Sequence, residues 1–131
     1  MRVETGLPRE DVTYKSGNVT LMVTDMDRAV EFYTDKLGFE LKVRYGNEWA
    51  EVAAPGLMLG LHQARGPIAR SDPNIGMSIG LEVDDIEATV GELKAKGIPF
   101  PSPIRETNDL RQASFTDPDG TPLYLAEIKP R

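Results

Sequence analysis

Residues 18–39, NVTLMVTDMDRAVEFYTDKLGF, decide the fold because they indicate a buried strand, then a capped helix, then a residue that ends the helix. Residues 78–98, SIGLEVDDIEATVGELKAKGI, repeat the same order of features further along the chain. Two copies that agree in register and in their end signals indicate repeated structural units, whereas one helical stripe alone would be weak evidence.

Both copies carry the signals of a helix that packs along a single face. Apolar residues recur with helical spacing, at Met26, Val30, Tyr33 and Leu37 in the first copy and at Ile86, Val90 and Leu93 in the second. Each helix is expected to begin at a capping residue followed three positions later by an acid, and to end at a glycine. The start and end residues are Thr24 and Gly38 in the first copy, and Asp84 and Gly97 in the second.

The remaining pattern predicts four short strands in each copy. We expect strands at residues 16–23, 40–45, 49–53 and 57–62, and again at 75–83, 98–105, 112–116 and 121–128. The three prolines in segment 98–105 predict an edge strand or an irregular strand. The turn at 117–120 (DPDG) joins the last two strands and accounts for Asp117 and Asp119.

These elements predict an α+β fold made of two βαβββ modules. We assign residues 1–14 to an N-terminal arm, 15–63 to the first module, 64–74 to a linker and 75–131 to the second module. Because five short elements cannot close a core alone, the modules should share one. The natural packing is a curved, mixed sheet of eight strands around a cleft.

Composition excludes several classes of function. The 131 residues suffice for one domain, the net charge is −6, and no Lys/Arg cluster suggests binding to nucleic acid. No apolar run could span a bilayer and no leader is apparent, so we expect a cytoplasmic protein that does not bind membranes. The absence of cysteine excludes disulfides and thiol chemistry.

Three segments resemble the vicinal-oxygen-chelate superfamily, which includes glyoxalase I, extradiol dioxygenases, and fosfomycin and bleomycin resistance proteins. They are residues 23–33 (VTDMDRAVEFY), 37–39 (LGF) and 115–120 (FTDPDG), and the likeness extends over residues 16 to 128. The resemblance implies paired βαβββ modules, a cavity inside the curved sheet and, usually, a homodimer. It does not fix the chemistry, because this fold supports many functions.

The resemblance also locates where a metal would be bound. Metal-dependent relatives place His, Glu or Gln on the first and last strands of each module, at positions that correspond to Asn18, Gly60, Ser78 and Tyr124. None of these is a good ligand, and Gly60 has no side chain. His62, the only histidine, could form with Glu82 no more than a weak displaced site. We therefore expect no metal, no cofactor and no catalytic residue.

Without a metal, the cavity is expected to bind a small molecule. Strand alternation selects the ligand-binding candidates, which are Asn18, Thr20, Tyr45, Trp49, Met58, His62, Ser78 and Tyr124. Trp49 and Tyr45 could stack a flat ligand. The small residues Gly60, Ser78 and Gly80 are expected to keep the cleft open.

The leading hypothesis is a metal-free protein that sequesters natural-product antibiotics, similar to bleomycin resistance proteins, with clefts formed across a homodimer. The alternative is a metal-dependent enzyme of the superfamily, such as a glyoxalase-like lyase or isomerase, or a dioxygenase, with a displaced metal. A third possibility, an interaction module, would require a filled cavity. Metal analysis of the purified protein distinguishes the first two hypotheses.

Overall fold

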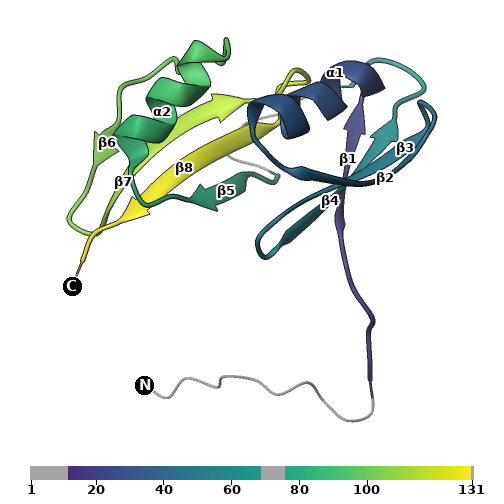
Figure 1. Ribbon diagram of the computed structural model, residues 1–131, viewed down its shortest axis with the longest axis horizontal. Coiled ribbons are helices and arrows are strands. Elements are labelled where there is room, and N and C mark those ends of the chain that lie inside the picture. The colour runs from purple at the N-terminus through teal and green to yellow at the C-terminus, as the bar shows by residue number, and fades with distance from the viewer. Residues whose placement is uncertain (1–11, 69–75, 131) are drawn as a thin grey trace.

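The computed structural model describes residues 12–68 and 76–130, which form two modules of the same topology (Figure 1). The first contains β1 (Val19–Val23), α1 (Met26–Glu31), the π-helix η1 (Phe32–Lys36), β2 (Glu40–Tyr45), β3 (Trp49–Ala54) and β4 (Leu57–Gln63). The second contains β5 (Ile79–Glu82), α2 (Ile86–Ala95), β6 (Arg105–Glu106), β7 (Leu110–Thr116) and β8 (Pro122–Ile128).

Each module forms one mixed sheet of four strands. The strand orders are β1-β4-β3-β2 and β5-β8-β7-β6, and in both sheets the first pair is parallel while the others are antiparallel. The α+β class and the paired βαβββ modules are thereby confirmed, with the eight strands divided between two hydrogen-bonded sheets. Part of the expected arm (1–11), part of the expected linker (69–74) and residue 75 of the expected second module lie outside the described residues, so those boundaries stay predictions.

Both helices begin one residue later than expected. Asp25 and Asp85 are the N-caps, and their carboxylates accept hydrogen bonds from the backbone N–H of Arg28 and Ala88. The expected cap Thr24 was wrong because an adjacent aspartate satisfies the same backbone group, and aspartate is at least as good a cap. The expected cap Asp84 was wrong as well, because the adjacent Asp85 caps the helix in its place.

The first helix changes its winding in its second half. The N–H of Leu37 bonds to the carbonyl of Phe32 at 3.0 Å, five residues back, which is the spacing of a π-helix. This wider turn places both Phe32 and Tyr33 in the interior. The chain then leaves the helix at Gly38, whose φ of +83° confirms the predicted glycine stop.

Segment 98–105 is almost entirely irregular. Within it only Arg105 is in strand conformation, and together with Glu106 it forms the short edge strand β6 (Arg105–Glu106). Proline has no N–H to donate to a sheet, and three prolines in five residues leave pairing possible only after the last of them. The expected strand was therefore too long, although its place at the sheet edge was correct.

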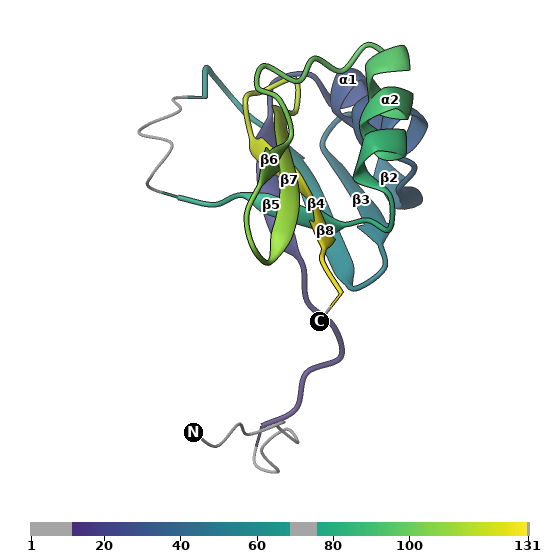
Figure 2. The same cartoon turned by 90° about the vertical axis from the view of Figure 1, so that its left-hand side faces the viewer.

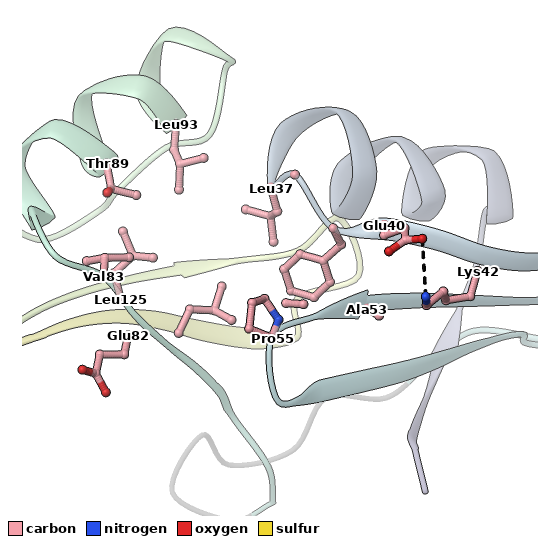
Figure 3. Close-up of a pocket in the computed structure, with 14 residues that line it drawn as sticks. Leu37, Glu40, Lys42, Ala53, Pro55, Glu82, Val83, Thr89, Leu93 and Leu125 are labelled. Carbon is pink, nitrogen blue, oxygen red and sulfur yellow. Dashed lines mark hydrogen bonds and ion pairs between the residues drawn. The ribbon is translucent and has the colours of Figure 1, made fainter. Parts of the chain in front are cut away.

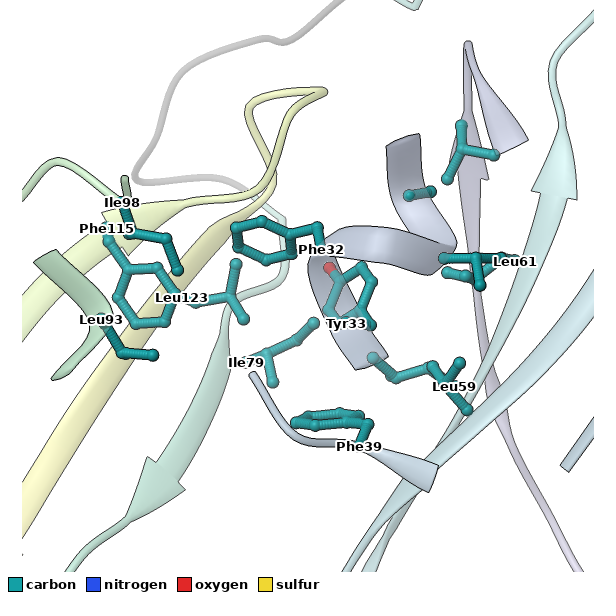
Figure 4. Packing of buried hydrophobic residues seen from close by; sticks show 14 of the residues in the cluster. Phe32, Tyr33, Phe39, Leu59, Leu61, Ile79, Leu93, Ile98, Phe115 and Leu123 are labelled. Atoms are coloured by element: carbon teal, nitrogen blue, oxygen red, sulfur yellow. The ribbon is translucent and has the colours of Figure 1, made fainter. Parts of the chain in front are cut away.

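The two modules share one hydrophobic core. Helix α1 packs on β3 and β4, α2 packs on β7 and β8, and both helices lie on the same side of the molecule (Figures 1 and 2). Figure 4 shows Phe32 and Tyr33 from the first module near Ile79 and Leu123 from the second. No helix among the described residues combines the length and apolar composition needed to cross a bilayer.

The hairpin turn between β7 and β8 joins the modules through its two aspartates. The buried Asp117 carboxylate accepts a hydrogen bond of 2.8 Å from the Tyr33 hydroxyl and others from the backbone N–H of Asp119 and Thr121. The Asp119 carboxylate accepts from the hydroxyl and the backbone N–H of Thr24. The interpretation that the turn alone accounts for both aspartates was therefore wrong.

The bond between Tyr33 and Asp117 predicts a stability effect. Tyr33→Phe removes one hydroxyl and leaves an oxygen of the buried carboxylate without its partner, so we expect a loss of about 1–3 kcal/mol in the free energy of unfolding. Urea denaturation monitored by circular dichroism measures it. Tyr45→Phe is the matched control, because Tyr45 is 67% exposed, and should change stability by less than about 0.5 kcal/mol. Equal effects of the two variants would contradict this role of the bond.

Candidate functional site

Each sheet has one face that carries no helix, called here the helix-free face. Strand pairing in the first sheet aligns four side chains across this face in one row. Tyr45 is paired with Trp49, Trp49 with His62, and His62 with Met22. The rings of Trp49 and His62 meet edge to face, with centroids 6.1 Å apart. Tyr45 and Met22, at the ends of the row, are exposed.

The adjacent row contains a carboxylate, a glycine and a hydroxyl. Glu51 is paired with Gly60, and Gly60 with Thr20. The indole N–H of Trp49 donates to Oε2 of Glu51 at 3.0 Å, which holds the ring along its own strand. Together, the two rows offer an aromatic ring, an imidazole, a carboxylate and a hydroxyl within one small area.

The second sheet presents a comparable but simpler surface. Tyr124 on β8 is paired with Gly80 on β5 and with Ser114 on β7, so the three residues share the helix-free face. Glu82 lies two residues further along β5 and is exposed. This face therefore also combines an aromatic ring with a carboxylate.

The structure separates the eight predicted ligand-binding residues into two groups. Strand pairing and alternation place Thr20, Tyr45, Trp49, Met58 and His62 on the helix-free face of the first sheet, and Asn18 accepts a hydrogen bond from Thr20 at 3.1 Å. Tyr124 lies on the second sheet, and Ser78 immediately precedes β5. Whether any of the eight contacts a ligand stays a prediction.

Sequence reasoning omitted Glu51, although a signal for it was present. Glu51 is two residues from Trp49 on one strand, so the alternation that selected Trp49 also selects Glu51. It is the carboxylate that bonds to the candidate ring, which makes it a stronger candidate than the exposed Asn18.

Two glycines do not open space as expected. A Cβ atom at Gly60 would lie 2.3 Å from Cη2 of Trp49, and one at Gly80 would lie 2.3 Å from Cζ of Tyr124. Real Cβ contacts are never this short, so both positions are already occupied by the chain's own aromatic rings. The expectation that these glycines keep the cleft empty was wrong.

The described residues do not fit a metal ion within one chain. No group of three or more His, Asp or Glu side chains in the described part of the chain could hold one. His62 keeps its Nδ1 buried with no hydrogen-bond partner among the described residues, and the carboxylate nearest in register, Glu51, already bonds to Trp49. A divalent ion needs several converging N or O donors.

Charges with perturbed pKa values lie away from these faces. The hydrogen bond from Lys129 holds the pKa of the Glu106 carboxyl below its usual value. The pKa of Arg111 is raised, mainly by its hydrogen bond to Glu87 on α2. Both groups belong to the network that fastens α2 to the edge of the second sheet, so they have a structural role.

A separate cavity of about 660 Å³ lies between the modules (Figure 3). Leu37, Leu93 and Glu82 are among the residues that line it (Figure 3). Its other polar groups are already paired, since Glu40 contacts Lys42 at 3.4 Å and the Thr89 hydroxyl donates to the carbonyl of Asp85. None of the eight predicted residues lines this cavity.

Comparisons with known proteins agree with this architecture. YetH of Bacillus subtilis (strain 168) is 30% identical over 118 residues, covering 85% of this chain and 96% of YetH. TnmS3, an antibiotic-binding protein from Streptomyces sp. CB03234, has a crystal structure with a TM-score of 0.62 and 26% identity, covering 90% of this chain and 100% of TnmS3. Lactoylglutathione lyase from Agrobacterium tumefaciens gives a TM-score of 0.68 at 21% identity, covering 88% and 95%, a likeness of fold alone.

A family model matches residues 15–125, which is most of the chain and includes all three segments that carried the sequence resemblance. The chain therefore belongs to the glyoxalase/bleomycin resistance protein/dioxygenase superfamily.

Proposed function

We propose that the protein binds a small organic molecule of the natural-product antibiotic type and sequesters it without chemical change. The observation that carries the proposal is the chemistry of the helix-free faces. They present aromatic rings and hydrogen-bonding groups, which suit the recognition of organic molecules, while the possible metal donors among the described residues of one chain do not converge.

The likeness to TnmS3 supports this choice over the enzymatic alternative. TnmS3 is described as an antibiotic-binding protein, and its whole length is matched at 26% identity. The lactoylglutathione lyase is less similar in sequence, at 21% identity. In addition, the sequence resemblance assigns the metal-ligand positions of metal-dependent relatives to Asn18, Gly60, Ser78 and Tyr124, none of which is a good ligand.

We also propose that the complete cleft forms across a homodimer. Within one chain the shared core brings together the helix-bearing faces, and Trp49 and Tyr124 do not line a common cavity among those described. The helix-free face of the first sheet exposes apolar residues, with Met22 at 41% and Tyr45 at 67%. Strands β1 and β5 each pair with only one strand among the described residues, so each has a free edge for a second chain.

Binding without a metal is the first prediction of this proposal. Titration with a panel of natural-product antibiotics should quench tryptophan fluorescence saturably with at least one compound, because Trp49 is the only tryptophan. Equilibrium dialysis should give one ligand per chain and the same affinity with and without EDTA. The proposal fails if no compound binds and the protein instead turns over a small substrate on addition of Ni²⁺, Zn²⁺, Mn²⁺ or Fe²⁺. In that case, His62→Ala should abolish the activity.

Dependence of binding on the dimer is the second prediction. Light scattering should give twice the mass of one chain. Dilution that separates the dimer should release the ligand in parallel, because neither chain alone carries the complete cleft. A monomer that binds the same compound with unchanged affinity would contradict the shared cleft, while leaving the binding function intact.

A further inference from the structure

The two modules repeat one topology, so strand pairing identifies which of their residues are equivalent. Leu59 on β4 and Leu123 on β8 correspond, because each is paired with the first residue of the first strand of its own module. Their partners on the neighbouring antiparallel strand lie two residues before Ala54 and Asp117. Ala54 in the first module is therefore the equivalent of Asp117 in the second.

The contact between the modules differs between these equivalent positions. At one end, the Tyr33 hydroxyl donates to the buried Asp117 carboxylate at 2.8 Å. Leu93 is the equivalent of Tyr33, because each lies eight residues after the aspartate that caps its helix. The corresponding pair at the other end is thus Leu93 and Ala54, whose hydrocarbon side chains cannot form a hydrogen bond.

The cavity of about 660 Å³ lies at this second position. Leu93 and Ala54 both line it, together with Pro55 from the turn between β3 and β4 (Figure 3). Between equivalent strand pairs this turn comprises residues 54–57, one residue fewer than 117–121 in the second module, and it contains no aspartate. The cavity is therefore the counterpart of the space that a phenol and an aspartate turn fill at the other end.

The wall of the cavity is apolar where it is buried and charged only where it is exposed. Leu93 and Leu125 supply buried apolar surface. The charged lining residues are Glu40, Lys42 and Glu82, all of which are exposed, and Glu40 is paired with Lys42 at 3.4 Å. A charged ligand that entered the buried part would lose its hydration without gaining a charged partner there. The lining therefore suits a neutral molecule.

One half-buried hydroxyl adds a polar contact to this apolar wall. Thr89 on α2 lines the cavity, and its hydroxyl donates to the backbone carbonyl of Asp85 at 2.9 Å. A hydroxyl that donates one hydrogen bond can still accept another at its oxygen. The lining therefore offers an acceptor for a ligand that carries a single hydroxyl group.

We infer that this cavity is a second ligand site, separate from the proposed cleft, for a neutral aromatic molecule that carries one hydroxyl group. The ring packs between Leu93 and Pro55, and its hydroxyl donates to Thr89. The ligand thus supplies the ring and the hydroxyl that Tyr33 supplies at the other end. A volume of about 660 Å³ falls within the range of about 300–1,000 Å³ that is usual for small-molecule sites. All of the lining comes from one chain, so the site does not require the dimer.

Three naphthalenes that differ in the charge of one substituent test the ligand class. 1-Naphthalenemethanol is neutral, 1-naphthylmethylamine is a cation at pH 7 and 1-naphthoate is an anion. Titration followed by methyl NMR should show the alcohol binding saturably, with shifts at Leu93 and Leu125, and at least about tenfold more tightly than either charged compound. Equal or tighter binding of a charged compound would overturn the ligand class. Shifts at Met22 and Met58 of the helix-free face instead would overturn the site.

The hydroxyl contact has its own test. Thr89→Val keeps the shape of the side chain and removes the acceptor, so the alcohol should bind about threefold or more less tightly. 1-Methylnaphthalene lacks the hydroxyl, so its affinity should be the same for the variant and the wild type. An equal loss of affinity for both compounds would contradict the hydrogen bond to Thr89.

A double variant that copies the filled end into the empty end tests the position of the site. Leu93→Tyr combined with Ala54→Asp fills the cavity, so we expect a native circular dichroism spectrum and affinity for the alcohol reduced at least about tenfold. Leu110→Tyr is the control, because Leu110 on β7 does not line the cavity, and its affinity should equal that of the wild type. Unchanged affinity in the folded double variant would overturn the site. If the double variant does not fold, Ala54→Leu, which fills part of the cavity from the turn, decides in the same way.

The inference and the proposed function can fail separately. An antibiotic bound by the wild type should bind equally well to the double variant, because the cavity lies apart from the eight residues predicted for the cleft. A wild-type protein that binds an antibiotic but not 1-naphthalenemethanol would overturn the second site alone. One that binds the alcohol with shifts at Leu93, but binds no antibiotic, would overturn the proposed function alone.

Discussion

Each four-stranded sheet of this protein can bury only one of its faces within a single chain, and the two helices decide which one. Apolar side chains from both modules meet on the helix-bearing side, and the buried bond from Tyr33 to Asp117 fixes the modules against each other. The opposite faces are released from core packing. Their side chains can therefore be selected for recognition without loss of the fold.

This arrangement explains how one scaffold can serve both binding and catalysis within its superfamily. The metal-dependent relatives need donor atoms that converge on one metal ion, whereas a flat organic molecule needs protein surfaces that lie parallel to its plane with room for it between them. On this chain, Gly60 and Gly80 stand in strands where a larger side chain would displace a ring. Tyr124 lies on β8, one of the strands that would present ligands to an ion, and Trp49 lies on β3 with its ring over Gly60 of the neighbouring β4. The cleft that we propose therefore suits contact with the surface of an organic molecule better than coordination of a metal ion.

Much of the fold could be predicted from the sequence because it depends on local signals. The repeated stripe, the stops at Gly38 and Gly97 and the prolines before β6 are all visible in short segments. The features that were missed depend on contacts between distant residues. The π-helix at 32–36 leaves the apolar stripe intact, and no sequence pattern shows that Asp117 reaches Tyr33 in the other module. The ring over each glycine likewise depends on strand register, while Glu51 could have been found by alternation.

In the dimer that we propose, each binding site is assembled from two chains. Trp49→Ala and Tyr124→Ala should each bind poorly, when alone, the antibiotic that the wild type binds. After subunit exchange in an equal mixture, about a quarter of the sites should recover wild-type affinity, because half of the dimers are mixed and each of these holds one site with both rings. Equilibrium dialysis measures the recovery, with differently tagged chains to show that mixed dimers have formed. Mixed dimers that bind no better than the separate variants would contradict a site shared between chains.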